Sequence, residues 1–353
     1  MDTAELTETA EQPVARRRRR RSVLLVQIAA LAAAVYWLVV PRLGDTGRVL
    51  HRIDDVSPPL VLLGTALGVA ALLAYAQVTR NLLPRTGRPR LARQFGVVVS
   101  SVGVNRVAPL GMAAGAAVAY KLLVREGLGR GDIAFAMGVQ AVGSALVLQV
   151  ILWPAMLIAA PLSGISPALR SGLYLAGGFG LVFLAIVAFV LWGLYGRRDA
   201  TTRILVAVAN KLRIGRDRAA EGIASACGRL DQLRSDPRTV VRTTGWAMAN
   251  WLTDAASLWV FLVAFGADVS PLWVLVAFGV ANVVAMVPIT PGSLGITETT
   301  LAIVLIGFGA ATSPVFLGIA AYRMVHYWLP IPGGLLAYTL LRARPAAAAS
   351  QAN

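Results

Sequence analysis

Four ionisable residues lie within long apolar stretches of this chain, where a charge is costly to bury. They are Arg106, Asp254, Glu298 and Arg323. Each costs roughly 2.5 to 3.5 kcal/mol at the depth of a bilayer on insertion scales, so such residues are the first candidates for function. Two are positive and two are negative, and pairing would neutralise the set. A guanidinium left unpaired would suit a phosphate, because its planar fork binds two oxygens at once.

Spacing along the chain predicts how these charges are arranged. Glu298 stands at the start of a predicted helix, where the helix dipole favours a carboxylate, and it is predicted to pair with Arg323. Arg323 and His326 are three residues apart and share a helix face. Arg106 is then left for a phosphate, with a structural Arg106–Asp254 pair as the alternative. Asp254 is a secondary candidate for proton coupling. His326 is predicted as a core or interfacial side chain rather than a proton relay, and it is included among the candidate substrate-binding residues.

The composition predicts a membrane protein. The 353 residues are 57% hydrophobic and only 14% charged, whereas a soluble domain carries about 25% charged residues. Lysine and arginine exceed acidic residues by 33 to 17, which fits an anionic inner leaflet better than a nucleic acid. One cysteine and two histidines exclude an internal disulfide and a zinc cluster. No metal or cofactor is expected.

Six apolar windows are long enough to cross hydrocarbon about 30 Å thick. The windows are residues 22–40, 60–78, 133–160, 173–194, 243–265 and 313–341. The first window follows an arginine run and is predicted to be a retained anchor rather than a cleaved signal. The predicted fold class is an all-α polytopic membrane protein.

Two further apolar stretches, 95–120 and 271–308, are each interrupted by turn residues near the middle. Proline removes a helix donor and glycine permits a tight reversal, and each flank is about half the length of a crossing. Each stretch is therefore predicted to form a re-entrant helical hairpin. The turn residues that would line a site are Asn105, Pro109, Gly111, Pro291, Gly292 and Gly295.

Loop charges predict the orientation. The loop at 79–94 carries five arginines and no acid, and positive loops remain in the cytoplasm, so both termini are predicted to be cytoplasmic in a multi-pass protein of the cell membrane. The two membrane halves then run in opposite directions, which predicts an inverted repeat, a recurrent design in transporters. The predicted organisation is a tail at 1–21, a first half at 22–194, a basic amphipathic linker at 195–242, a second half at 243–341 and a tail at 342–353.

The two turn motifs resemble those of the lysylphosphatidylglycerol synthase transmembrane-region family, which are flippase-like membrane proteins. The first is Asn105-Arg106-Val107-Ala108-Pro109-Leu110-Gly111, and the second runs from Ile289 to Glu298 and is followed by Tyr322-Arg323. The resemblance implies a lipid-translocating region with an amphipathic lipid as cargo. Many members carry an acidic residue and an arginine after the first turn, whereas residues 112–115 are uncharged here. The soluble synthase domain is not expected after residue 344.

The sequence predicts a non-enzymatic membrane protein that binds and translocates a lipid. The cargo would be an anionic or aminoacylated phospholipid or a polyprenyl-phosphate-linked lipid, with Arg106 and Arg323 on its phosphate. Asp254 and Glu298 would hold those arginines or the positive end of the cargo. The alternative is a scaffold or accessory subunit for a lipid or glycolipid synthesis enzyme. A third hypothesis is a membrane-embedded lipid transferase, in which Asp254, Glu298 or His326 would have to serve as the nucleophile or base. Catalytic residues and a nucleic-acid partner are not predicted.

Overall fold

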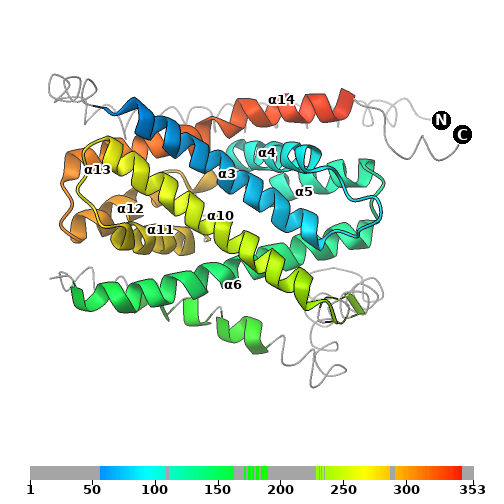
Figure 1. Ribbon diagram of the computed structural model, residues 1–353, viewed down its shortest axis with the longest axis horizontal. Coiled ribbons are helices and arrows are strands. Elements are labelled where there is room, and N and C mark those ends of the chain that lie inside the picture. The colour runs from blue at the N-terminus through cyan, green and yellow to red at the C-terminus, as the bar shows by residue number, and fades with distance from the viewer. Residues whose placement is uncertain are drawn as a thin grey trace, which may run out of the picture. The chain divides into compact units, whose positions relative to one another are not determined.

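The computed structural model describes residues 56–108, 111–162, 236–286 and 291–343, and separate positions within 171–189 and 228–235. The chain divides into two units at residue 55, and the described residues all belong to the second unit. The elements named below are helical (Figure 1). They are α3 (Pro58–Leu82), α4 (Leu91–Val107), α5 (Gly111–Arg125), α6 (Arg130–Leu162), α10 (Pro237–Ala264), α11 (Pro271–Ala285), η2 (Pro291–Ser293), α12 (Ile296–Gly307), α13 (Thr312–Arg323), η3 (Met324–Trp328) and α14 (Pro330–Ala343).

Three of the described helices are long and apolar enough to cross a membrane. They are Pro58–Leu82, Arg130–Ala159 and Pro237–Ala264, and they coincide with the second, third and fifth predicted windows. The described positions of the fourth window, between 171 and 189, are helical. The first window lies outside the described residues. The full count of six crossings and two re-entrant hairpins therefore stays a prediction.

The last predicted crossing is divided into α13, the π-helix η3 and α14. Proline causes the division, because an α-helical carbonyl accepts from the N–H four residues later and Pro330 has none to offer to His326. The N–H of Leu329 instead donates to the Met324 carbonyl at 3.0 Å, which widens the turn. Such π turns occur frequently at functional sites.

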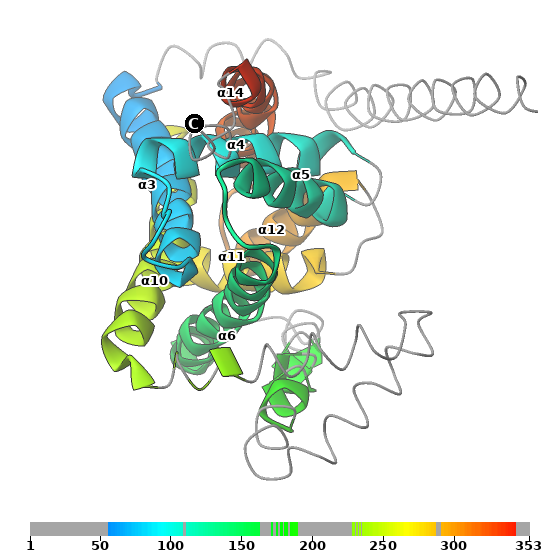
Figure 2. The ribbon, with the colours of Figure 1, turned by 90° about the vertical axis from the view of Figure 1, so that its right-hand side faces the viewer.

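The two predicted hairpins correspond to pairs of helices that pack along each other, α4 with α5 and α11 with α12 (Figures 1 and 2). Close approach in the first pair depends on glycine: a Cβ at Gly115 would lie 2.6 Å from the Ser101 carbonyl oxygen, and one at Gly111 would lie 2.1 Å from that of Asn105. The turn residues 109–110 and 287–290 lie outside the described residues. Entry of these pairs into a membrane from one side stays a prediction.

Helices α3 and α10 form an extensive antiparallel contact. The Asn250 amide donates to the Ala71 carbonyl at 2.9 Å, and the Ser257 hydroxyl donates to the Gly64 carbonyl at 2.7 Å. Residue numbers thus rise along α10 as they fall along α3. Small residues on α3 permit this approach, since a Cβ at Gly64 would lie 2.9 Å from the Phe261 ring.

We refer to α3–α6 as the first set and to α10–α14, with η2 and η3, as the second set. The packing contacts of one set have counterparts in the other. Contacts α3·α4, α4·α5, α5·α6 and α3·α6 correspond to α10·α11, α11·α12, α12·α13 and α10·α13. Between the sets, α4 packs on α14 as α11 packs on α6. Figure 2 shows α4 and α5 beside α14, with α11 near α6.

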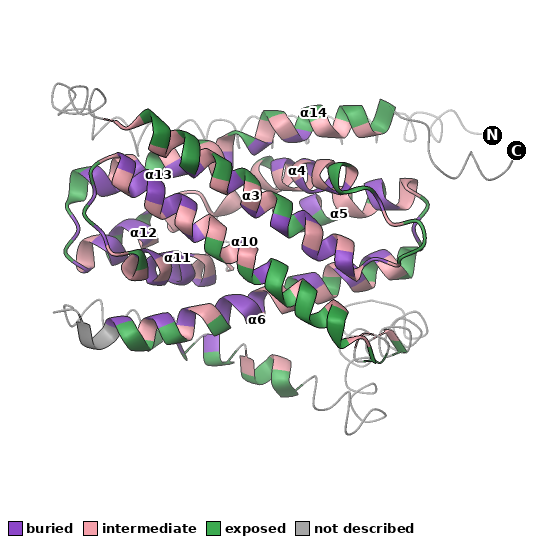
Figure 3. Ribbon diagram, in the orientation of Figure 1, coloured by how far each residue is buried: buried purple, intermediate pink, exposed green. Residues whose placement is uncertain are grey.

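Exposed positions lie along the described helices (Figure 3), and many of them are large apolar residues. Leu62 on α3 is 72% exposed, Leu157 on α6 is 71% exposed and Leu335 on α14 is 67% exposed. The buried core lies mainly within the second set, where α10 to α13 enclose residues such as Phe261 and Leu305. Exposed apolar faces on several helices are what a hydrocarbon solvent permits and water disfavours.

Polar side chains satisfy backbone groups at the end of α3 and at the start of α10. The Arg88 guanidinium donates to the Leu83 carbonyl at 2.6 Å and so closes the end of α3, and burial lowers the pKa of Arg88. Helix α10 begins at Pro237, within the segment predicted as linker, because Asp236 caps it by accepting from the Thr239 N–H at 3.2 Å. The basic loop and the start of α10 also meet in an exposed Arg85–Asp236 pair.

Candidate functional site

Three of the four buried charges predicted from the sequence line a single cavity of about 110 Å³. Arg106 extends into it from α4, Asp254 from α10 and Arg323 from the end of α13. Of the described residues that line this cavity, Arg106 alone belongs to the first set. The remaining polar lining comes from five elements, through Asn282 of α11, Ser293 of η2, Thr297 of α12, Tyr322 of α13 and His326 of η3.

The fourth charge, Glu298, holds Arg323 in place, as predicted. The Arg323 Nε donates to Glu298 Oε1 at 2.5 Å, and both side chains are about nine-tenths buried. The other carboxylate oxygen accepts from the Gly295 N–H at 2.8 Å. Gly295 has a φ of 82°, a value that favours glycine. The Arg323 Nη2 is buried without a partner, so this guanidinium retains a free donor.

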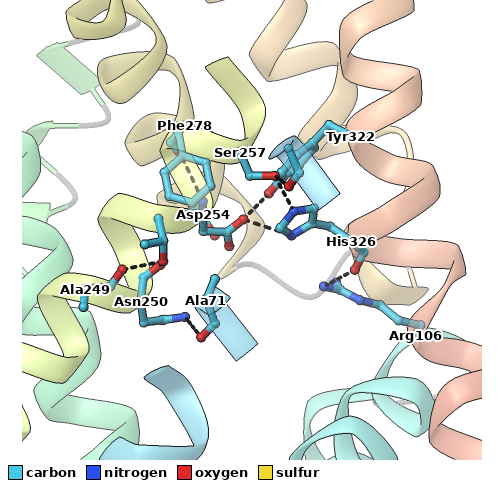
Figure 4. A network of polar contacts seen from close by, with 12 residues as sticks. Ala71, Arg106, Ala249, Asn250, Asp254, Ser257, Phe278, Tyr322 and His326 are labelled. Atoms are coloured by element: carbon cyan, nitrogen blue, oxygen red, sulfur yellow. Dashed lines mark hydrogen bonds and ion pairs between the residues drawn. The ribbon is translucent and has the colours of Figure 1, made fainter. Parts of the chain in front are cut away.

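Arg106 has no carboxylate partner among the described residues. Its Nη2 donates to the His326 carbonyl at 3.4 Å (Figure 4), the carbonyl that Pro330 leaves without an α-helical donor, and its Nε is buried without a partner. The alternative Arg106–Asp254 pair is therefore not formed. Arg106 thus reaches the cavity with unused hydrogen-bonding capacity.

Tyr327 connects the two arginines. Its ring centroid lies 5.2 Å from the Arg106 guanidinium carbon and 4.8 Å from that of Arg323. Its hydroxyl donates to the Arg106 carbonyl at 2.8 Å, near the end of α4. The aromatic face stabilises both cations without neutralising either, so the positive charge stays available.

Asp254 is occupied by two neighbours from the α13–η3 segment. The Tyr322 hydroxyl lies 2.8 Å from Asp254 Oδ1, and His326 Nδ1 lies 3.0 Å from the same oxygen. The Tyr322 and His326 rings stack at 4.2 Å between centroids. On the other side of the imidazole, His326 Nε2 lies 2.9 Å from the Ser257 hydroxyl oxygen (Figure 4).

The order carboxylate, imidazole, hydroxyl is that of a hydrolase triad, but the surroundings of Ser257 do not suit a nucleophile. Ser257 has no exposed surface, is not among the residues that line the cavity, and donates its hydroxyl to the Gly64 carbonyl. A substrate carbonyl has no access to this oxygen. The arrangement instead fixes the orientation of the imidazole.

The second turn has an unusual backbone. Gly292 and Ser293 are both left-handed, with φ of 59° and 55°, and non-glycine residues with this conformation concentrate at functional sites. A Cβ at Gly292 would lie 2.8 Å from the Tyr327 ring. The Ser293 hydroxyl donates to the Ala285 carbonyl at 3.2 Å, which closes the turn. Both residues line the cavity.

Other predicted site residues have different positions. Asn105 and Gly111 pack against each other and are not among the residues that line the cavity. Pro109 lies outside the described residues, and Pro291 begins η2. His326, a candidate substrate-binding residue that was not expected to relay protons, lines the cavity beside Asp254.

Sequence reasoning missed Ser257 and Tyr327. Ser257 lies three residues after Asp254 on one helix face, so the i, i+3 spacing could have indicated it. Tyr327 belongs to the stretch Tyr327-Trp328-Leu329-Pro330, which also carries the family resemblance. Its spacing gave no indication of a role, because that role depends on the π turn that rotates it toward α4. Within the described part of the chain, no three His, Cys, Asp or Glu residues gather as a metal site would require.

Comparison with known proteins bears on this arrangement. The chain matches the family described as lysylphosphatidylglycerol synthase TM region over residues 24–334. It is also similar to the inner membrane protein YbhN of Escherichia coli (strain K12), with 25% identity over 95 residues, which are 27% of this chain and 29% of that protein. The matched segment is thus less than a third of that relative. The family match spans both turn motifs and confirms the resemblance that they carry.

Proposed function

Because the chain belongs to the lysylphosphatidylglycerol synthase TM region family and is an integral membrane protein, we propose that it binds the phosphate of a membrane lipid and moves that headgroup across the bilayer. One observation carries the proposal. Arg106 and Arg323, from the two sets of helices, line the same cavity and each has a buried N–H group without a partner.

The size of the cavity limits what it can hold. A volume of about 110 Å³ accommodates several water molecules or one phosphate group with its immediate substituents. Acyl or prenyl chains exceed this volume and would remain among the apolar outer faces. The site therefore suits a headgroup, whereas a whole lipid would not fit.

The hydrogen-bonding groups of the site favour an anion. Glu298 neutralises Arg323 through a direct pair, and Asp254 is occupied by Tyr322 and His326. Among the described residues, no carboxylate contacts Arg106. A phosphate that accepts from Arg106 and from the free Nη2 of Arg323 would satisfy donors that are otherwise buried and unpaired, which cost about 1–3 kcal/mol each.

The two sets of helices offer a physical route for translocation. Their corresponding contacts and the antiparallel pairing of α3 with α10 support the predicted inverted repeat. In transporters built this way, one repeat moves against the other around a site at the repeat interface. A cavity with Arg106 from one set and Arg323 from the other is suited to such a movement.

A liposome assay tests the proposal. The full chain is reconstituted, and the movement of fluorescent lipids between leaflets is followed by quenching from outside. The panel contains phosphatidylglycerol, its lysyl ester, a polyprenyl phosphate and a ceramide without phosphate. We expect acceleration for at least one phosphate-bearing lipid and none for the ceramide.

Arg106→Gln is the decisive variant, with Arg90→Gln as its matched control. Arg90 is an exposed arginine at the other end of the same helix. We expect Arg106→Gln to abolish the acceleration and Arg90→Gln to retain it. If no lipid is accelerated, or if a folded Arg106→Gln protein transports normally, the proposal is wrong and a scaffold role becomes the better interpretation.

A further inference from the structure

We propose that His326 takes up a proton together with the anion, so that the cavity binds the two as a pair. The inference rests on the proposed anion site and adds the proton as a second ligand. Its basis is the set of hydrogen-bonding partners around the imidazole, together with the charge of the groups that face it.

The first imidazole nitrogen is a donor. His326 Nδ1 lies 3.0 Å from Asp254 Oδ1, and this oxygen also lies 2.8 Å from the Tyr322 hydroxyl. A carboxylate that accepts two hydrogen bonds is favoured in its ionised form. Nδ1 must therefore carry a proton in either charge state of the ring.

The second nitrogen is where the proton can be added or lost. The Ser257 hydroxyl has one proton and two neighbours, the Gly64 carbonyl at 2.7 Å and His326 Nε2 at 2.9 Å. A carbonyl can only accept. When the hydroxyl donates to Gly64, Nε2 must donate to the hydroxyl oxygen, and the ring is then an imidazolium. When the ring is neutral, the hydroxyl donates to Nε2 and loses its bond to Gly64.

Uptake of one proton from water thus rotates a single hydroxyl and requires no other rearrangement. Both contacts of Ser257 have ordinary hydrogen-bond lengths, so the same positions of the heavy atoms suit either arrangement. The imidazole packs closely against α3, since the Nε2 atom lies only 2.6 Å from where a Cβ of Gly68 would stand. His326 is held by α3 and α10 in a position where both nitrogens have partners.

The groups that face His326 come from each element packed around it. Helix α10 presents Asp254 and Ser257, α13 presents Tyr322, and α4 presents the Arg106 guanidinium to the His326 carbonyl. Arg323 of α13 lines the same cavity. Helix α3 presents only Gly68 and the Gly64 carbonyl, neither of which titrates. Glu298 is the one further carboxylate of the site, and Arg323 occupies it.

The charges of these groups couple the proton to the anion. With a neutral ring, Arg106 and Arg323 balance Asp254 and Glu298, and a monoanion would leave the buried site negative. With an imidazolium the site carries one excess positive charge, which a monoanionic phosphodiester cancels. Each ligand therefore favours the other, and linkage requires the effect to be equal in both directions.

A binding measurement separates this inference from the proposed function. The probe is dihexanoyl phosphatidylglycerol, a phosphodiester that stays monoanionic, titrated calorimetrically into the full-length protein in detergent. We expect its affinity to fall by about tenfold, within the usual range for coupled sites, between about pH 5.5 and about pH 8.5, where histidine changes charge. Buffers with different ionisation enthalpies should report uptake of close to one proton at the alkaline end.

Because the chain has two histidines, histidine-selective ¹⁵N labelling gives a direct second measurement. The imidazolium signal that is lost in His326→Gln should persist to higher pH when the probe is present, and His51→Gln should retain this behaviour. Ser257→Ala removes the acceptor of the Nε2 proton, so binding should require lower pH.

Each outcome has a separate meaning. If the probe binds equally at all pH values without proton uptake, the coupling is wrong and the anion site stands. If the probe binds at no pH, the proposed function fails. If His326→Gln does not fold, the ¹⁵N titration of the wild-type protein still decides, since an imidazolium signal indifferent to the probe contradicts the coupling.

Discussion

The two turns of this molecule bring an arginine to the same cavity by different means. The second turn is stabilised by a buried ion pair: the Glu298 carboxylate accepts hydrogen bonds from both the Gly295 N–H and Arg323. The first turn is held by close backbone packing at Gly111 and Gly115, and its arginine has no carboxylate partner among the described residues. The comparison indicates that Arg323 stabilises the second turn as well as keeping one free donor, whereas Arg106 has no carboxylate contact that would compete with a ligand.

The largest effect should come from opening the charged turn. Arg323→Gln leaves the Glu298 carboxylate buried without its partner, which costs about 3–5 kcal/mol. We expect this variant to lose most of its folded yield in detergent, as measured by size-exclusion chromatography and thermal unfolding.

The double variant Glu298→Gln with Arg323→Gln provides the control. Removing both charges avoids an unpaired buried charge, so it should recover much of the Tm that Arg323→Gln loses. An additive loss in the double variant would mean that the pair is not what stabilises the second turn, and the contrast between the turns would then fail.

The first turn should be sensitive to volume where the second is sensitive to charge. Gly115→Ala places a Cβ 2.6 Å from the Ser101 carbonyl oxygen, and overpacking of this kind costs about 1–3 kcal/mol. Gly138→Ala, in open space on α6, is the matched control and should leave the Tm unchanged or slightly higher. Equal Tm values for the two variants would show that α4 and α5 do not depend on close approach.

Hydropathy and charge pairing were sufficient to predict much of this arrangement. Apolar length located α3, α6 and α10, because burial in hydrocarbon constrains length more strongly than any local signal. The Glu298–Arg323 pair followed from the cost of leaving either charge alone. Apolar length and the presence of a buried charge can both be recognised from the residues of a segment without knowledge of its neighbours.

The partners of Asp254 could not be predicted in the same way. Choosing between Arg106, His326 and Tyr322 as its neighbour requires the rotation of η3, and that rotation depends on a π turn beside Pro330. Ser257 shares a helix face with Asp254, but its partner could not be predicted, since a hydroxyl in an apolar helix commonly bonds its own backbone. The helices can be located from the sequence, but the contacts between them depend on how each helix is shifted and rotated against its neighbours, which a single sequence does not specify.

Tyr327 connects the two turns, so its hydroxyl should have a smaller effect than either turn. Tyr327→Phe keeps the ring beneath both guanidiniums but removes the donor to the Arg106 carbonyl, for an expected cost of about 1 kcal/mol. Tyr338→Phe, which loses only an exposed bond from Arg342, is the control. A loss of lipid binding without loss of stability in Tyr327→Phe would mean that the hydroxyl positions Arg106 for the ligand.

The smallest effect should come from the starts of the corresponding helices α3 and α10. Both have proline in the first turn, but Asp236 caps α10 through Thr239, whereas Ser57 makes no such bond to α3. The hydrogen bonds from Thr239 hold the pKa of Asp236 below its ordinary value of 3.8. A carboxyl with a depressed pKa stabilises the fold above that ordinary value, and this contribution is lost as the pH falls through the folded-state pKa.

Asp236→Ala should therefore lower the Tm at pH 7 by less than Tyr327→Phe does, and the difference from wild type should shrink on acidification. Ser57→Ala should have no effect on the Tm at either pH. A Tm loss in Asp236→Ala that is unchanged at acidic pH would show that the ionised cap is not what distinguishes the two helix starts.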